Sequence, residues 1–121
     1  ISFLNFIMLV SNLTKKRVVH YNAKPCNGIF SQLTGMMFSK KRNNALIFKF
    51  NKEKIISLHM FFVFYPIDVL FLNKNKIVVD KKENFKPFAF YKSMEKSMYA
   101  IELPNAAIKR TKTRIGDKIK F

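Results

Sequence analysis

Acidic residues, cysteine, glycine and tryptophan are scarce or absent in this sequence of 121 residues. The single cysteine excludes a scaffold of internal disulfides. With three glycines in all, the chain has no glycine-rich phosphate-binding loop. No run reaches about 18 apolar residues, so a membrane-spanning helix is not expected. An apolar fraction of 49%, with 14 Phe, excludes intrinsic disorder and supplies the core of one domain over residues 1–121.

The shortage of acidic residues leaves the chain strongly basic. Lys and Arg number 23 against seven Asp and Glu, which gives a net charge of +16. Clusters of basic residues attract polyanions, because neutralising phosphates releases counterions. An A+T-rich genome that inflates lysine use, or an anionic membrane surface as the partner, would also fit this charge. The candidate RNA-binding residues form three clusters: Lys15, Lys16, Arg17, Lys40, Lys41, Arg42, Lys109, Arg110, Lys112 and Arg114.

Side chains that could carry catalysis are few and scattered. Cys26, His20 and His59 lack the close pairing that zinc sites use, so we expect no metal and no cofactor. A nucleophile formed by Cys26 with either histidine, and with Asp68 orienting the imidazole, is conceivable. Nothing in the spacing requires these groups to meet. We therefore expect a non-catalytic protein in which Cys26 is neither a nucleophile nor part of a disulfide.

Residues 1–10 are apolar and have the length of a signal-peptide core. No basic residue precedes this stretch, and no clear small-x-small cleavage site follows it. We interpret it as a first strand or the remainder of a trimmed N-terminus. Together with a lone thiol, which suits a reducing compartment, this predicts a cytoplasmic protein. A cleaved or truncated signal is the alternative.

Short runs rich in β-branched and aromatic residues, separated by turn residues, predict a mainly β protein. The run Ile55–Phe64 suits a strand buried on both sides, and residues 98–103 alternate so that one face carries the apolar bulk. Residues 68–80 predict a hairpin around Asn73-Lys74-Asn75. The remaining predicted strands are 17–22, 45–50, 87–91 and 118–121. Residues expected in the core are Leu46, Phe48, Val63, Val69, Phe71, Ile101 and Ile119.

Two short helices complete the expected fold. Ile29–Thr34 has an apolar face and precedes Gly35, a residue suited to ending a helix. Asn105 is placed to cap a second helix over Ala106–Thr111. About seven strands and one or two short helices favour a small single-domain barrel-like or sandwich fold.

Five motifs, in this order and spacing, resemble the domain of unknown function 192 family, in an archaeal-like version. The resemblance covers about residues 12–121. It implies a small, largely β, barrel-like domain without an established activity. The motifs are Gly35-Met36-Met37-Phe38; Ala45-Leu46-Ile47-Phe48; His59-Met60 with Pro66-Ile67-Asp68-Val69-Leu70-Phe71-Leu72; Tyr99-Ala100-Ile101-Glu102-Leu103-Pro104; and Ile115-Gly116-Asp117.

Three functions remain open. The favoured one is a non-catalytic RNA-binding protein, with the ribosome as a candidate partner, because the charge is high and no catalytic constellation is visible. The segment 81–92 interleaves Phe and Tyr with Lys, a mixture that single-stranded nucleic-acid binders use. The alternative is a small-ligand-binding module with a pocket at the barrel mouth near His59, Asp68 and Glu102. An enzyme using Cys26 or His59 is the third.

Overall fold

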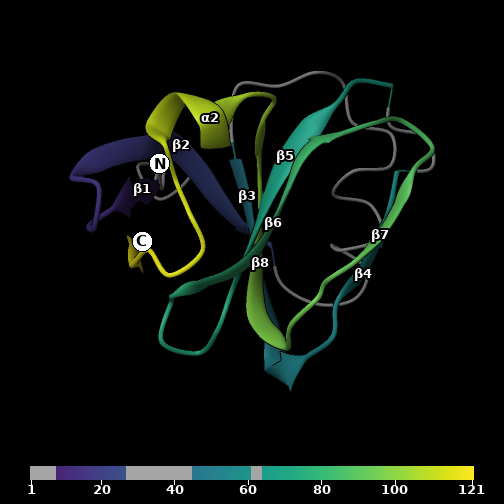
Figure 1. Cartoon of the computed structure of the whole chain (residues 1–121), viewed down its shortest axis with the longest axis horizontal. Coiled ribbons are helices and arrows are strands. Elements are labelled where there is room, and N and C mark those ends of the chain that lie inside the picture. The colour runs from purple at the N-terminus through teal and green to yellow at the C-terminus, as the bar shows by residue number, and fades with distance from the viewer. Residues whose placement is uncertain (1–7, 27–44, 61–63) are drawn as a thin grey trace, which may run out of the picture.

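The computed structural model describes residues 8–26, 45–60 and 64–121, and most of these residues lie in strands (Figure 1). Its one α-helix in the described ranges is α2 (Ala107–Thr111). The strands are β1 (Met8–Asn12), β2 (Arg17–Cys26), β3 (Ala45–Lys54), β4 (Ser57–His59), β5 (Ile67–Leu72), β6 (Val78–Phe85), β7 (Phe90–Lys92), β8 (Ser97–Pro104) and β9 (Ile119–Lys120).

Seven strands form one curled sheet in the order β6-β5-β8-β3-β2-β1-β9. All neighbouring strands are antiparallel except β2 and β3, which are parallel. The two ends of the sheet meet, because Ile77 forms an isolated bridge with Lys118 and the Ile119 amide donates to the Lys76 carbonyl over 2.9 Å. Curling in this way protects the edge strands. The predicted mainly β, barrel-like fold is confirmed.

The sheet carries a hydrophobic core on each face. The first core lies inside the curl and takes residues from the sheet strands and from Ala107 and Ile108 of α2. The second core lies between the outer face and the two-stranded sheet of β4 and β7. Val63 lies outside the described residues. The other six residues expected in the core are all buried: Leu46, Phe48, Val69, Phe71, Ile101 and Ile119.

Strand β8 is buried on both faces, because each face contacts one of the two cores. Tyr99, Ile101 and Leu103 face the first core, as the alternation predicts. The other face of β8 is buried too, because β8 lies between β3 and β5 and the second core covers it there. Glu102 is consequently only 6% exposed, even though its side chain is acidic. Its register places it opposite two apolar residues, Leu46 and Val69.

The prediction of one buried strand over Ile55–Phe64 is wrong. Only Ser57–His59 forms a strand in the described part of this stretch, and Phe64 is 70% exposed. Strand β8 already occupies the place between β3 and β5, so the segment after β3 pairs with β7 instead. Ser93, which follows β7, holds the chain just before β4 in place, because its hydroxyl accepts from the Ile56 amide at 2.9 Å.

Helix α2 confirms the second predicted helix but not its predicted cap. The N-cap position is Ala106, which has a left-handed backbone with φ 73° and makes no side-chain cap. Asp68 of β5 takes that role from a distance in sequence, since its Oδ2 accepts from the Ile108 amide at 2.9 Å. Its Oδ1 accepts from the Asn84 amide. A carboxylate near the first turn of a helix is favoured by the exposed backbone amides there. The other predicted helix, 29–34, lies outside the described residues.

The small sheet is fastened to the large one by Tyr91 and Asp80. The Tyr91 hydroxyl donates to Asp80 Oδ2 at 2.7 Å, and the Met94 amide donates to the same oxygen at 2.8 Å. Burial, together with the hydrogen bond and negative charge of Asp80, raises the pKa of Tyr91 to about 12. The phenol is therefore held in its protonated, donating form.

We expect this shift to appear in an alkaline titration followed by tyrosinate absorbance. The native protein should show a phenol ionising near pH 12, and Tyr91→Phe should remove that step. Because the folded pKa lies above the ordinary value, the stability that Tyr91 contributes is present below about pH 10 and is lost as the pH rises toward 12. A late step that persists in the variant would contradict the assignment.

Candidate polyanion-binding face

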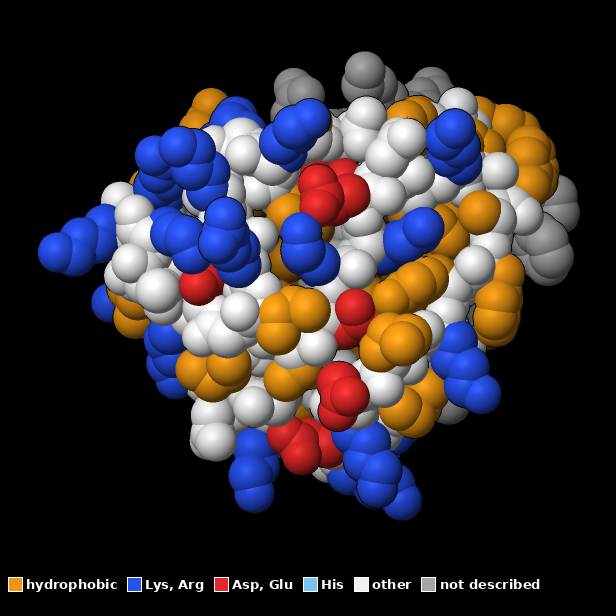
Figure 2. All heavy atoms as spheres, viewed as in Figure 1, with side chains coloured by type: hydrophobic (Ala, Val, Ile, Leu, Met, Phe, Trp, Pro, Cys, Tyr) orange, Lys and Arg blue, Asp and Glu red, His pale blue; other side chains and the backbone are white. Residues whose placement is uncertain are grey.

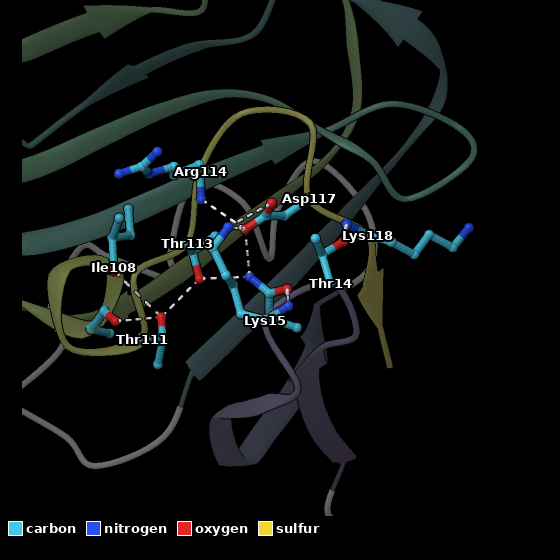
Figure 3. A network of polar contacts seen from close by, with 10 residues as sticks. Thr14, Lys15, Ile108, Thr111, Thr113, Arg114, Asp117 and Lys118 are labelled. Atoms are coloured by element: carbon cyan, nitrogen blue, oxygen red, sulfur yellow. Dashed lines mark hydrogen bonds and ion pairs between the residues drawn. The ribbon is translucent and has the colours of Figure 1, made fainter.

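Two of the three basic clusters are distant in sequence and adjacent in the structure. The turn between β1 and β2 packs on the segment that follows α2, and Asn12 joins them. Asn12 is fully buried, and its Nδ2 donates to Thr113 Oγ1 at 3.0 Å and to Asp117 Oδ2 at 2.9 Å. Its Oδ1 accepts from the Lys15 amide, which fixes the turn. Thr113 in turn shares a hydrogen bond with Thr111 of α2 (Figure 3).

Asp117 is the acceptor at the centre of this network. Besides Asn12, it accepts from Lys15 Nζ at 2.8 Å and from the Arg114 amide at 3.0 Å (Figure 3). Burial acts to raise the pKa of Asp117, but the hydrogen bonds from Asn12, Lys15 and Arg114 and the charge of Lys15 outweigh it and lower that pKa. The carboxylate therefore stays ionised and holds Lys15 in place.

Two arginines tie α2 to β2. Arg110 donates from Nη2 to the Val19 carbonyl at 2.8 Å, and Arg17 donates from Nη1 to the Arg110 carbonyl at 3.3 Å. Both side chains belong to exposed residues. A guanidinium has five N–H donors, so each arginine is oriented by one bond and keeps donors for another acceptor. Bidentate binding of phosphate is the interaction that this geometry suits.

The end of α2 places further cations beside them. Lys109 and Arg110 lie in the last turn, and Lys112 is the C-cap residue with a left-handed backbone at φ 56°. The amide at this cap donates to the carbonyls of Ile108 and Lys109. Positive side chains are favoured at a helix C-terminus because they lie near the exposed carbonyls. These carbonyls therefore favour the several positive side chains at the end of α2.

The charge balance of this part of the molecule is one-sided. Residues 8–26 and 103–121 contain ten Lys and Arg and one acidic residue, Asp117, for a net charge of +9 out of the total of +16. Figure 2 shows one group of blue side chains over the region where Figure 1 places β1, β2 and α2, and others at the right and bottom of the view. We call the exposed set the basic face: Lys16, Arg17, Lys109, Arg110, Lys112 and Arg114.

The remaining predicted RNA-binding residues fall into two groups. Lys15 is adjacent to the basic face, but its ammonium is paired with Asp117. Lys40, Lys41 and Arg42 lie outside the described residues. The aromatic and lysine-rich segment 81–92 divides, since Phe85 is buried in the second core while Phe88 and Phe90 are 60% and 65% exposed. That segment runs from β6, in the middle of the view, to β7 at the side away from β1 and β2 (Figure 1).

The sheet register places two of the three residues of the predicted pocket, Asp68 and Glu102, on opposite faces. Directly opposed residues share a face of a sheet and successive residues alternate, so Glu102, opposite Val69, lies on the outer face. Asp68, opposite Leu103, lies on the inner face and is bound to two backbone amides. His59 is opposite Phe90, on the side of the small sheet away from Leu58, which packs against the second core. The large sheet therefore separates Asp68 from Glu102, and a pocket near His59, Asp68 and Glu102 stays a prediction.

Side chains that could ligate a metal ion are dispersed over the described residues. No group of three or more His, Cys, Asp or Glu side chains is placed there to hold one. Within the same residues, no helix is both long enough and apolar enough to span a membrane. The backbone of Cys26 lies at the end of β2, opposite Phe48 of β3.

Residues 11–121 match the family model of DUF192, described as Uncharacterized ACR. The chain belongs to the DUF192 family. Among its relatives are UPF0127 proteins of two archaea. That of Thermococcus sibiricus is 34% identical over 113 residues, covering 92% of this chain and 73% of the relative. That of Pyrococcus furiosus is 33% identical over 112 residues, covering 91% and 95%.

Two solved structures share the fold of this DUF192 chain. A protein of unknown function from Novosphingobium aromaticivorans has a TM-score of 0.84, 20% identity, and coverage of 95% of this chain and 85% of its own. A candidate transcription regulator from Sinorhizobium meliloti has a TM-score of 0.81, 20% identity, and coverage of 93% and 89%. At this identity the similarity establishes the fold, and function has to be argued from the site.

Proposed function

We propose that this DUF192 protein is a non-catalytic RNA-binding domain that docks through its basic face, with ribosomal RNA as the candidate target. One observation carries the proposal. Arg17 and Arg110, which lie 93 positions apart, share one surface with the cations beside them, because hydrogen bonds of Asn12, Asp117 and Arg110 join the two segments. The acidic residue on this surface is buried and already paired, so the surrounding cations are available to phosphates.

Lysine inflation by genome composition accounts for this face less well. Such a bias acts on the whole chain and would scatter lysines regardless of tertiary position. It also gives no reason for the near absence of acidic residues from β1, β2, α2 and β9, which are assembled from both ends of the chain. Two arginines held by backbone carbonyls add positions that are oriented before any ligand binds.

The proposal makes a quantitative statement about salt. Each neutralised phosphate contributes roughly 0.9 to the slope of log affinity against log salt on a duplex, and about 0.7 on a single strand. If all six residues of the basic face contact phosphates, the slope is about −5 on duplex RNA and about −4 on single-stranded RNA. Fluorescence anisotropy with labelled RNA between about 50 and 200 mM salt measures it.

Changing Lys109, Lys112 and Arg114 together to Ala should reduce the magnitude of this slope by about two to three, almost independently of RNA sequence. The free energy of unfolding should barely change, because exposed charges contribute little to it. Lys86, Lys92 and Lys96 provide the control: they are exposed, lie elsewhere on the surface, and their change to Ala removes the same charge. An equal effect of both triple variants would assign the binding to net charge and contradict a defined face.

Specificity for the proposed target is tested separately. Ribosomal RNA, a random RNA of equal length and heparin are compared at about 150 mM salt, near the physiological range. Tighter binding to ribosomal RNA, with co-sedimentation of the protein with ribosomes, is the expected result. Equal affinities without co-sedimentation would overturn ribosomal RNA as the target.

A further inference from the structure

A groove of about 770 Å³ adjoins the basic face. Its floor and walls come from β2, from Pro104 at the end of β8 and from Arg110 of α2. Tyr21 is the most exposed of its aromatic residues, with 75% of its surface accessible. The lining residues are Val18, Val19, His20, Tyr21, Asn22, Pro104 and Arg110.

Two neighbouring rings form a stacking platform in this groove. The Tyr21 and His20 rings lie 5.7 Å apart between centroids, with planes inclined by only 23°. His20 is held in place because its Nδ1 accepts from the Asn22 amide at 3.0 Å. Val18, which is 44% exposed, adds apolar surface. A flat π-face beside apolar surface is what an unstacked nucleobase requires.

A phosphate-binding group lies at the same groove. Arg110 lines it, and the bond from Arg110 to the Val19 carbonyl holds the guanidinium against β2. Arg17, another residue of the basic face, donates to the carbonyl of Arg110 and continues the cationic edge of the groove. A base on the platform would therefore have its own phosphate within the cationic region. Base-stacking rings joined to a cationic track are the arrangement by which proteins hold single strands.

We propose that this groove binds one unpaired nucleobase of RNA, stacked on Tyr21, with an adjoining phosphate at Arg110. The inference rests on the proposed function, because the cationic edge of the groove is part of the basic face. It adds a preference for unpaired RNA over duplex RNA, which phosphate contacts alone do not give. Bases in a duplex are stacked on one another and cannot enter the groove, whereas bases in a loop or single strand can.

The test compares two probes of the same length, an oligouridylate of about 12 nucleotides and a mixed-sequence RNA duplex, at constant salt. Uridine is chosen because the strand stays largely unstacked. Tyr21→Ala should weaken oligouridylate binding roughly 5- to 150-fold, the range for loss of one stacked base. It should leave duplex binding unchanged. Tyr21→Phe should restore binding, since the ring and not the hydroxyl carries the stacking.

Phe90→Ala is the matched control, because Phe90 is 65% exposed but lies on β7 in the small sheet. It should alter neither affinity, and unchanged thermal melting of Tyr21→Ala confirms that the fold is intact. If Tyr21→Ala has no effect, or weakens both probes equally, the groove proposal is overturned while the basic face stands. If the native protein binds neither probe, the proposed function fails as well.

Discussion

Phe71→Ala should lower the free energy of unfolding by about 3–5 kcal/mol, the range for loss of a fully buried phenylalanine. Phe71 has no exposed surface and lies in the second core, opposite Ala100 of β8. Its ring centroid is 5.7 Å from that of Tyr91, so it also packs between the large sheet and the small one. Truncation would leave a cavity where two layers meet, and neither layer can close it without shifting the other.

Urea unfolding followed by circular dichroism measures this loss, and Phe90→Ala provides the comparison. Phe90 is the same residue type with most of its ring exposed, and we expect its truncation to cost within about 0.5 kcal/mol. A loss below about 1 kcal/mol for Phe71→Ala would contradict the described position of β5. Domains of this size are stable by about 5–15 kcal/mol, so the variant stays measurable at low temperature.

Asp117→Asn should lower the free energy of unfolding by about 2–3 kcal/mol, because it removes the negative charge that strengthens the hydrogen bonds Asp117 accepts inside the protein. The native carboxylate accepts from Asn12, Lys15 and Arg114, and the residue is 4% exposed. An amide at this position brings donors toward Asn12 Nδ2 and Lys15 Nζ. Lys15 retains 28% of its side-chain surface, so water can solvate its ammonium and the loss stays below that of a fully buried pair.

The difference in the free energy of unfolding between Asp117→Asn and the native protein should depend on pH in a defined direction. The folded pKa of Asp117 is lowered, so the stability it contributes is present above the ordinary value near pH 4 and is lost as the pH falls through the folded pKa. The two unfolding free energies should therefore converge in acid. A difference that stays constant from about pH 7 to pH 2 would show that the charge of Asp117 is not involved.

The same substitution separates stability from binding. Removing the carboxylate charge releases Lys15 beside the basic face, so the salt slope for RNA should steepen by up to about one unit while the fold becomes weaker. Glu83→Gln is the control, because Glu83 pairs with Lys81 over 2.8 Å at the surface. That change should cost less than about 1 kcal/mol and leave the salt slope unaltered.

Much of the strand content could be predicted from local sequence. The hairpin of β5 and β6 follows from the apolar runs on either side of Asn73-Lys74-Asn75, and its tight turn is present, with Asn73 Oδ1 accepting from the amides of Asn75 and Ile77. The buried strand centres follow from their β-branched and aromatic residues. These signals are readable because they depend on neighbours one to four positions away.

Other features depended on competition between distant segments. The run after β3 reads as a buried strand, yet β8 occupies the adjacent place in the sheet, and Ser57–His59 pairs elsewhere. Asn105 has the composition of a helix cap, yet Asp68, which is 40 residues from Ile108, fills that role. Local propensity is a weak prior wherever a tertiary partner can satisfy the same backbone groups.

Some features of the candidate site also follow from the sequence, and others follow only from the tertiary structure. The sequence by itself determined the large net charge, the scarcity of acidic residues at both ends of the chain, and the identity of the basic clusters. Only the tertiary structure decided that Lys16 and Arg17 share a face with the residues of α2, that Lys15 is paired with Asp117, and that Tyr21 lines a groove with Arg110. The reason is physical: charge is a property of each residue, whereas proximity across about 100 positions is created by Asn12, Thr113 and Asp117, whose buried hydrogen bonds form only when the two ends of the chain meet.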